Sequence, residues 1–184
     1  MRQKIKRNQG FTIIEVMIVL AVAGLILVIV LLAVPALQRS ARNTGRKSDA
    51  SRIASAVSSF VGNSNGSLPC ETGTTGGFTT TPNDAATVLA DAGKLGQLSQ
   101  LSANAACVTT PPRPSSTTTG LYITNANPGG NPLKWHDNFV VVYIGSVCQA
   151  NWATTSGAVA RNAALIYPIE QSGGTFIPGC DTAL

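Results

Sequence analysis

The stretch GFTIIEVMIVLAVAGLILVIVLLAVPAL, residues 10–37, decides how this chain is built. Within it, the 22 consecutive residues from Val16 to Leu37 carry no charged side chain. As an α-helix they would extend about 33 Å, enough to cross the hydrocarbon core of a membrane. The whole chain has 184 residues, room for about one domain. Its apolar content is concentrated at the front, which indicates a membrane segment followed by a polar exported domain.

Positive charge precedes the span. Four basic residues lie there: Arg2, Lys4, Lys6 and Arg7. The positive-inside rule then places the N-terminus in the cytoplasm and the rest of the chain outside. Beyond the first ten residues, nine basic residues face eight acidic ones, so the net charge of +5 is not a nucleic-acid-binding footprint.

One acid, Glu15, sits at the edge of the apolar run. A carboxylate there is costly in lipid and usually functional. It ends the run Gly10-Phe11-Thr12-Ile13-Ile14-Glu15. Together with the basic leader and the long apolar helix, this run resembles the class III signal peptide and N-terminal methylation motif of the type IV pilin and pseudopilin family.

The resemblance covers roughly residues 1–62 and implies a maturation pathway. A prepilin peptidase would cut between Gly10 and Phe11 and methylate the new N-terminus at Phe11. Glu15 would be an assembly residue that faces the N-terminal ammonium of a neighbouring subunit. The implied partners are further copies of the chain, other pilins, the prepilin peptidase, the inner-membrane assembly machinery and, before assembly, the lipid bilayer.

Three other interpretations compete. An ordinary secretory signal could be cut after Ala21-Val22-Ala23, although Glu15 would interrupt its apolar core. The segment could be a plain single-span anchor with a chance glutamate. Glu15 could also simply favour the helix dipole, which explains neither Gly10 nor Phe11.

The helix is predicted to continue past the membrane. An apolar stripe at helical spacing runs through Ala50, Ile53, Val57, Phe60 and Val61, and stop signals follow from Gly62-Asn63 onward. The predicted organisation is a leader (1–10), a membrane and filament-core helix (11–37), an amphipathic helix (38–62) and a globular head (63–184).

Two features of this helix need an explanation. Pro35 cannot donate to Leu31, so a kink or a loosened turn is expected there. A basic cluster lies between Arg39 and Arg52. It could face lipid headgroups or acidic neighbours, or it could be a solvated helix face; the pattern leaves both open.

The strands are expected late in the head. The strongest candidate is Phe139–Ile144; a weaker one is Leu121–Thr124. Ala164–Glu170 and Thr175–Ile177 flank Ser172-Gly173-Gly174 and are typical of a hairpin. A helix is also expected to start at Thr81-Pro82-Asn83-Asp84. The predicted fold is α+β: a long N-terminal helix, transmembrane and then amphipathic, packed on a small antiparallel sheet.

Four cysteines, Cys70, Cys107, Cys148 and Cys180, all follow the apolar segment. An even number in an exported domain predicts two disulfides, and we favour Cys70–Cys107 and Cys148–Cys180 among three possible pairings. Metal binding is not expected, because there is no C-x-x-C pair and only one histidine, His136.

No catalytic residues or cofactor are expected. The sequence has no nucleophile elbow and no Gly-rich phosphate loop, and His136-Asp137 beside Trp135 is better explained as a turn with an aromatic anchor. The leading hypothesis is a structural subunit of a pilus-like surface filament, serving adhesion, motility or DNA uptake. The alternatives are a minor pilin, a secretion pseudopilin, or a membrane-anchored binding protein that never polymerises.

Overall fold

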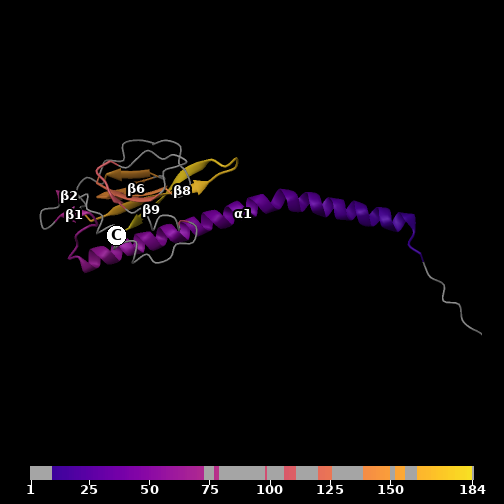
Figure 1. Cartoon of the computed structure of the whole chain (residues 1–184), viewed down its shortest axis with the longest axis horizontal. Coiled ribbons are helices and arrows are strands. Elements are labelled where there is room, and N and C mark those ends of the chain that lie inside the picture. The colour runs from indigo at the N-terminus through magenta and orange to yellow at the C-terminus, as the bar shows by residue number, and fades with distance from the viewer. Residues whose placement is uncertain are drawn as a thin grey trace, which may run out of the picture. The chain divides into compact units, whose positions relative to one another are not determined.

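A computed structural model of the chain describes residues 10–72, 77–78, 98, 106–110, 120–125, 139–149, 152–155 and 161–183 (Figure 1). The chain divides into two compact units, Met1–Ser40 and Ala41–Leu184. The leader residues 1–9 and the helix expected to start at Thr81 lie outside the described residues.

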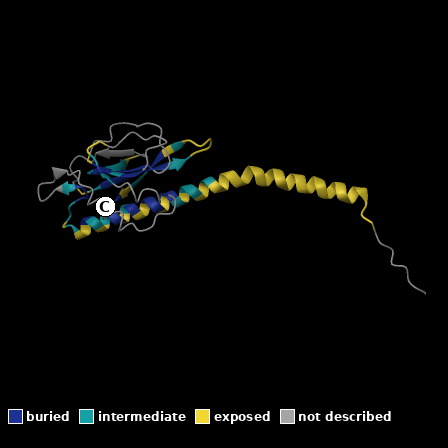
Figure 2. Cartoon of the chain, in the orientation of Figure 1, coloured by how far each residue is buried: buried dark blue, intermediate teal, exposed yellow. Residues whose placement is uncertain are grey.

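The first unit is built from the beginning of helix α1, which runs from Ile13 to Asn63. The helix continues past Pro35, which lies inside it rather than ending it. Every large apolar side chain of this unit is exposed, from Phe11 to Leu37 (Figure 2). Within the described residues, α1 is the single helix long and apolar enough to span a membrane. A helix is suited to the interior of a membrane because it satisfies its backbone hydrogen bonds internally.

The helix ends in a left-handed turn. Asn65 and Gly66 have φ values of 53° and 83°, and the Gly66 amide donates to the Val61 carbonyl at 2.9 Å. This is the bond by which a Schellman turn satisfies a terminal carbonyl. The guanidinium of Arg161 lies directly over Gly66, which places a cation at the negative end of the helix dipole. The predicted stop near Gly62-Asn63 is confirmed.

The second unit contains a five-stranded sheet with the order β3-β4-β5-β8-β9. Its strands are β3 (Ala106–Cys107), β4 (Gly120–Thr124), β5 (Phe139–Ile144), β8 (Ala163–Glu170) and β9 (Phe176–Ala183). Two short hairpins complete the described strands: β1 (Glu71–Thr72) with β2 (Gly77–Phe78), and β6 (Ser146–Gln149) with β7 (Trp152–Thr155).

The α+β prediction is confirmed, but the sheet is mixed and not wholly antiparallel. β3 pairs with β4 and β4 with β5 in parallel, whereas β5–β8 and β8–β9 are antiparallel. Connection length permits the two parallel pairs. The chain has 12 residues between β3 and β4 and 14 between β4 and β5. Parallel neighbours need a crossover of about a dozen residues or more, and both connections are long enough.

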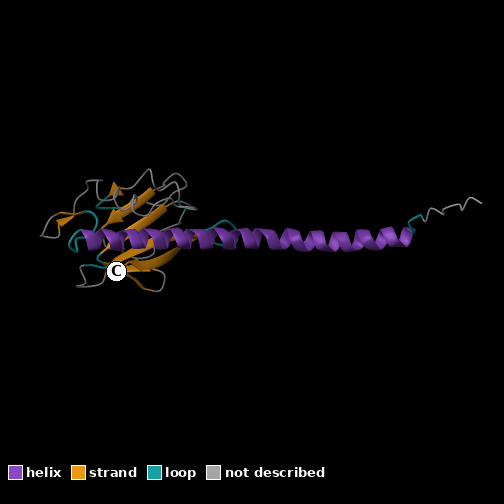
Figure 3. Cartoon of the chain, turned by 90° about the horizontal axis from the view of Figure 1, so that it is seen from below, coloured by secondary structure: helices purple, strands orange, loops and turns teal. Residues whose placement is uncertain are grey.

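The sheet buries a core on each face. The inner core joins the second half of α1 to one face of the sheet, and Figure 3 shows this half of α1 lying across the strands. Alternate residues of β5 divide between the faces, with Val140 and Val142 turned to the helix. The outer core lies on the opposite face and comprises Phe139, Val141, Tyr143, Ala164 and Ile166.

Candidate functional site

Gly10 and Phe11 lie in irregular backbone immediately before the helix begins. Nothing approaches within 4 Å of the position where Gly10 would carry a side chain, and Phe11 is 86% exposed. The peptide bond between them is therefore unobstructed by the part of the chain that the structure describes. This is the arrangement that a peptidase needs, although the cleavage and methylation predicted for these residues stay predictions.

Glu15 belongs to a capping box at the start of α1. The Glu15 amide donates to Thr12 Oγ1 at 3.4 Å. In return, Glu15 Oε2 accepts from the Thr12 amide at 3.5 Å and from the Thr12 hydroxyl at 3.4 Å. A threonine that caps a helix and a glutamate three residues later satisfy each other's free backbone donors. The Thr-x-x-Glu spacing of a capping box is present in the sequence, but capping was not among the roles predicted for Glu15.

These three contacts are long for hydrogen bonds, and both side chains are exposed. The capping box therefore orients the Glu15 carboxylate without enclosing it. Its outer face stays open to a further cationic partner. Glu15 is also the one charged residue between Ile13 and Leu37. An ammonium group that reached it in an apolar environment would gain a strong charge-assisted contact.

A second polar cluster joins the helix to the β8–β9 hairpin, and we call it the hairpin clamp: Arg42, Asn43, Arg46 and Glu170. Arg42 holds the Glu170 carboxylate with two hydrogen bonds, Nε to Oε2 at 2.8 Å and Nη2 to Oε1 at 2.7 Å. Asn43 pairs with the Glu170 backbone in both directions, at 2.8 and 2.9 Å. Arg46, only 3% exposed, adds a contact of 3.5 Å to the same carboxylate.

The electrostatics of the hairpin clamp follow from this geometry. Hydrogen bonds from Arg42, together with the charges of Arg42 and Arg46, hold the pKa of the Glu170 carboxyl below its ordinary value, against the effect of burial. The Arg46 guanidinium also lies 5.2 Å from the centre of the Phe176 ring, within cation–π range. A bidentate arginine–carboxylate pair fixes orientation as well as charge, so the clamp sets where the hairpin meets the helix.

The hairpin clamp answers the question left open by the basic cluster. Arg42 and Arg46 face the head of their own chain, whereas Lys47 is exposed. Neither interpretation from the sequence anticipated an intramolecular acceptor 128 residues away from Arg42. The acid Asp49, which lies within the cluster, is buried and accepts a hydrogen bond from the Leu98 amide at 2.9 Å. It thereby anchors a distant segment to the helix.

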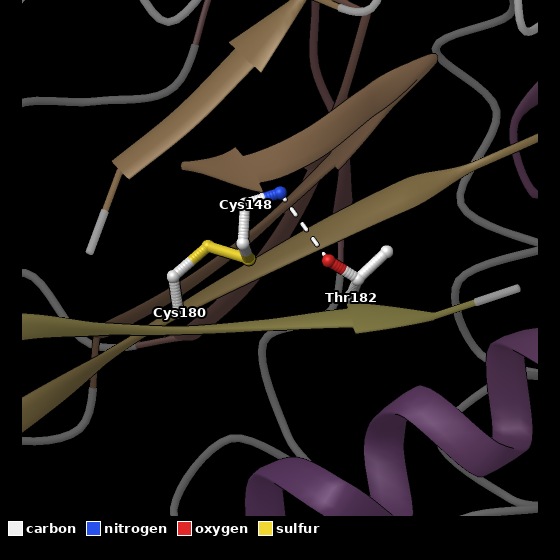
Figure 4. Close-up of a disulfide and its surroundings, with 3 residues drawn as sticks. All are labelled: Cys148, Cys180 and Thr182. Carbon is white, nitrogen blue, oxygen red and sulfur yellow. Dashed lines mark hydrogen bonds between the residues drawn. A yellow bond between two sulfur atoms is a disulfide. The ribbon is translucent and has the colours of Figure 1, made fainter. Parts of the chain in front are cut away.

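The structure contains two disulfides, Cys70–Cys107 and Cys148–Cys180, which are the pairs favoured from the sequence. The first joins the segment after the helix to β3 in the inner core. The second joins β6 to β9, and Figure 4 shows the Cys148 amide donating beside it to Thr182 Oγ1, at 3.2 Å. Each disulfide therefore connects an irregular or peripheral segment to the five-stranded sheet.

Other ionisable groups in the described residues do not gather into a site. Tyr167 is buried, donates to Asp181 and has its pKa raised to about 12, first by desolvation and then by that carboxylate. No group of three or more His, Cys, Asp or Glu side chains among these residues is arranged to hold a metal ion. Trp135, His136 and Asp137 lie outside the described residues.

Comparison with known proteins locates one match. The prokaryotic N-terminal methylation motif matches residues 5–31, which include Gly10, Phe11, Glu15 and the first part of α1. Neither the curated proteins nor the solved structures gave a match to the chain. The matched motif and the exposed apolar helix support a class III signal peptide at the N-terminus and a type IV pilin-like character for this chain.

Proposed function

We propose that the chain is a structural, non-catalytic subunit of a type IV pilus-like surface filament, polymerised through α1 after removal of the leader. The observation that carries this proposal is the surface of α1 between Ile13 and Leu37. It presents large apolar side chains on every side and a single charge, Glu15. Such a surface is unfavourable in water and is stable only in lipid or against other apolar helices.

The proposed membrane topology rests on the basic leader and on the disulfides of the head. The basic leader would stay in the cytoplasm, and the head would be exported. Both disulfides of the head support an oxidising, exported location. Prepilin peptidase would then cut after Gly10 at the cytoplasmic face and leave the mature chain beginning with an N-methylated Phe11. Mass analysis of the N-terminus tests this step, and an intact Met1 or a start at Gly24 would contradict it.

Glu15 would define how subunits assemble. Cleavage creates an ammonium group on Phe11, and an ammonium and a carboxylate that are each costly in an apolar core become tolerable as a pair. Because the capping box leaves the Glu15 carboxylate exposed, it can serve the start of its own helix and accept a neighbour's Phe11 ammonium. Pairing at each junction would set the axial spacing of subunits.

The decisive experiment separates charge from capping. Glu15→Val removes both functions, whereas Glu15→Gln removes the charge and keeps a side chain that can close the capping box. We expect both variants to be processed and membrane-inserted, and both to yield at least about tenfold fewer sheared surface filaments, because an unpaired buried ammonium costs several kcal/mol at each junction. Yields are compared at equal amounts of processed subunit in the membrane.

The outcomes discriminate among the candidate functions. Normal filaments from Glu15→Gln would reduce Glu15 to a helix cap and remove its role in assembly. If the wild-type chain is processed yet never found in surface filaments, a membrane-anchored protein that does not polymerise is the better description. Incorporation only in the presence of another, more abundant subunit would identify a minor pilin.

A further inference from the structure

The two disulfides differ in how far solvent reaches them. Cys70 is 0% exposed and Cys107 is 3% exposed, both within the inner core. Cys148 and Cys180 are only partly buried and lie at the edge of the outer core. A thiolate must reach a sulfur atom to open a disulfide. Reduction of Cys70–Cys107 therefore requires the core to open first, and reduction of Cys148–Cys180 does not.

The partly buried disulfide, Cys148–Cys180, holds the β6–β7 hairpin. This hairpin leaves the sheet at Gly145, whose φ of 68° turns the chain and whose amide donates to the Asn162 carbonyl at 2.7 Å. Its strands pair with each other and form a separate two-stranded sheet. Among the described residues, no strand ladder joins it to the five-stranded sheet. The disulfide and the hydrogen bond to Thr182 both attach it at Cys148 (Figure 4).

The hairpin lies against the outer face of the sheet. Both β6 and β7 contact β8 and β9, and Cys148 itself packs against the outer core. That core contains five buried residues, of which Phe139 and Tyr143 are the largest. The inner core, on the opposite face, has its own covering helix and its own disulfide. Detaching the hairpin would thus affect one face of the sheet and leave the other closed.

We infer that the Cys148–Cys180 disulfide is a reducible strap: a dithiol opens it selectively, and the β6–β7 hairpin then separates from the outer face of a head that otherwise stays folded. One thiolate of the dithiol attacks a sulfur of the pair and forms a mixed disulfide, and its second thiolate displaces the protein sulfur. The dithiol loses two electrons and becomes a cyclic disulfide. The protein gains two electrons and two protons as the thiols of Cys148 and Cys180.

Timed reduction of the purified full-length chain in detergent tests the selectivity. Dithiothreitol is the dithiol, and samples are quenched by alkylation and mapped by mass spectrometry. We expect Cys148 and Cys180 to be labelled at least about tenfold faster than Cys70 and Cys107, because only the latter pair must wait for an opening of the core. Equal rates, or earlier labelling of Cys70 and Cys107, would overturn the inference.

Hydrogen exchange on the partly reduced wild-type chain tests the release of the hairpin. The amides of β6 and β7 should exchange at least about tenfold faster than in the oxidised chain, while those of α1 between Ala50 and Val61 keep their protection. This species needs no variant to fold. The double variant Cys148→Ser with Cys180→Ser should reproduce the pattern, and Cys70→Ser with Cys107→Ser, as the matched control, should loosen the inner core instead. Unchanged exchange in the hairpin of the reduced chain would show that the disulfide is not a strap.

Discussion

The two halves of α1 share the same helical backbone but differ in how their apolar side chains are distributed and exposed. Before Ser40, apolar side chains point in every direction and are exposed. From Ala41 onward, buried residues alternate with exposed ones along the helix (Figure 2). Ala50, Ile53 and Val57 belong to the inner core, whereas most of the serines are exposed. One half depends on surroundings supplied from outside the chain and the other on its own head. Helical structure is common to both, and the distribution of apolar residues around the helix separates their roles.

The largest effect should come from placing the same truncation in each half. Ile53→Ala removes a fully buried side chain from the inner core and should lower the free energy of unfolding of the head by about 2–5 kcal/mol. Ile26→Ala, in the exposed half, is the matched control and should leave that stability unchanged within about 0.5 kcal/mol. Urea unfolding of the processed chain in detergent, followed by circular dichroism, measures both. Equal losses in the two variants would show that the halves are energetically coupled.

A smaller effect is expected at the hairpin clamp. Glu170→Gln weakens the contacts with Arg42 and leaves the guanidinium of Arg46, which is 3% exposed, without its carboxylate. Loss of a charged hydrogen-bond partner at such a site should destabilise the head by about 1–3 kcal/mol. Partial solvent exposure of Arg42, 41% of its side chain, keeps the effect below that of a fully buried pair.

The pH dependence of the stability difference between wild type and Glu170→Gln tests whether the charge of Glu170 causes it. Because the pKa of Glu170 is lowered from 4.5 on folding, its ionised form stabilises the head above pH 4.5, and this contribution is lost as the pH falls through the lowered pKa. The stability gap between wild type and Glu170→Gln should therefore be largest near neutral pH and shrink in acid. A gap that stays constant as the pH falls would attribute it to packing rather than to the charge of Glu170.

The smallest effect belongs to the first turn of the exposed half. Thr12→Val removes the hydroxyl of the capping box and should destabilise the start of α1 by about 1 kcal/mol, whereas Thr12→Ser should preserve it. Amide exchange of residues 13–16 in micelles should rise several-fold in the first variant only. An identical rise in both variants would rule out a capping role for the hydroxyl. Neither variant should alter the stability of the head.

The sequence predicted best those elements that depend on a pattern of neighbouring residues. A charge-free span and a stripe at helical spacing predicted α1. The run of β-branched and aromatic residues at Phe139–Ile144 predicted a strand that the structure reproduces. The β8–β9 hairpin was also predicted, but its second strand was expected to stop at Ile177. It continues to Ala183 through Pro178 and Gly179. An edge strand tolerates a proline, and any side chain at Gly179 would collide with Tyr167 and Ile169.

Features that depend on contacts between residues far apart in the sequence could not be predicted from local patterns. The parallel pairing of β4 with β5 depends on the path of the connection between them, which carries no periodic signal. The strands β6 and β7 are short, and no alternation marks them strongly. The contact of Arg42 with Glu170 joins residues that local patterns treat independently. Glu15 is the opposite case, because the Thr-x-x-Glu spacing that signals its capping role is local and present in the sequence.

The hairpin clamp also bears on the order in which the head can form. Arg42 meets a residue 128 positions later, and the sheet is completed by β9, which ends at Ala183. Closing so long a loop costs chain entropy before any contact compensates for it, and folds dominated by such contacts form slowly. In the topology proposed above, nearly all of the chain would have to cross the membrane before the helix acquires its final contacts. Until then the head would have an incomplete sheet, with unpaired strand edges available to other chains.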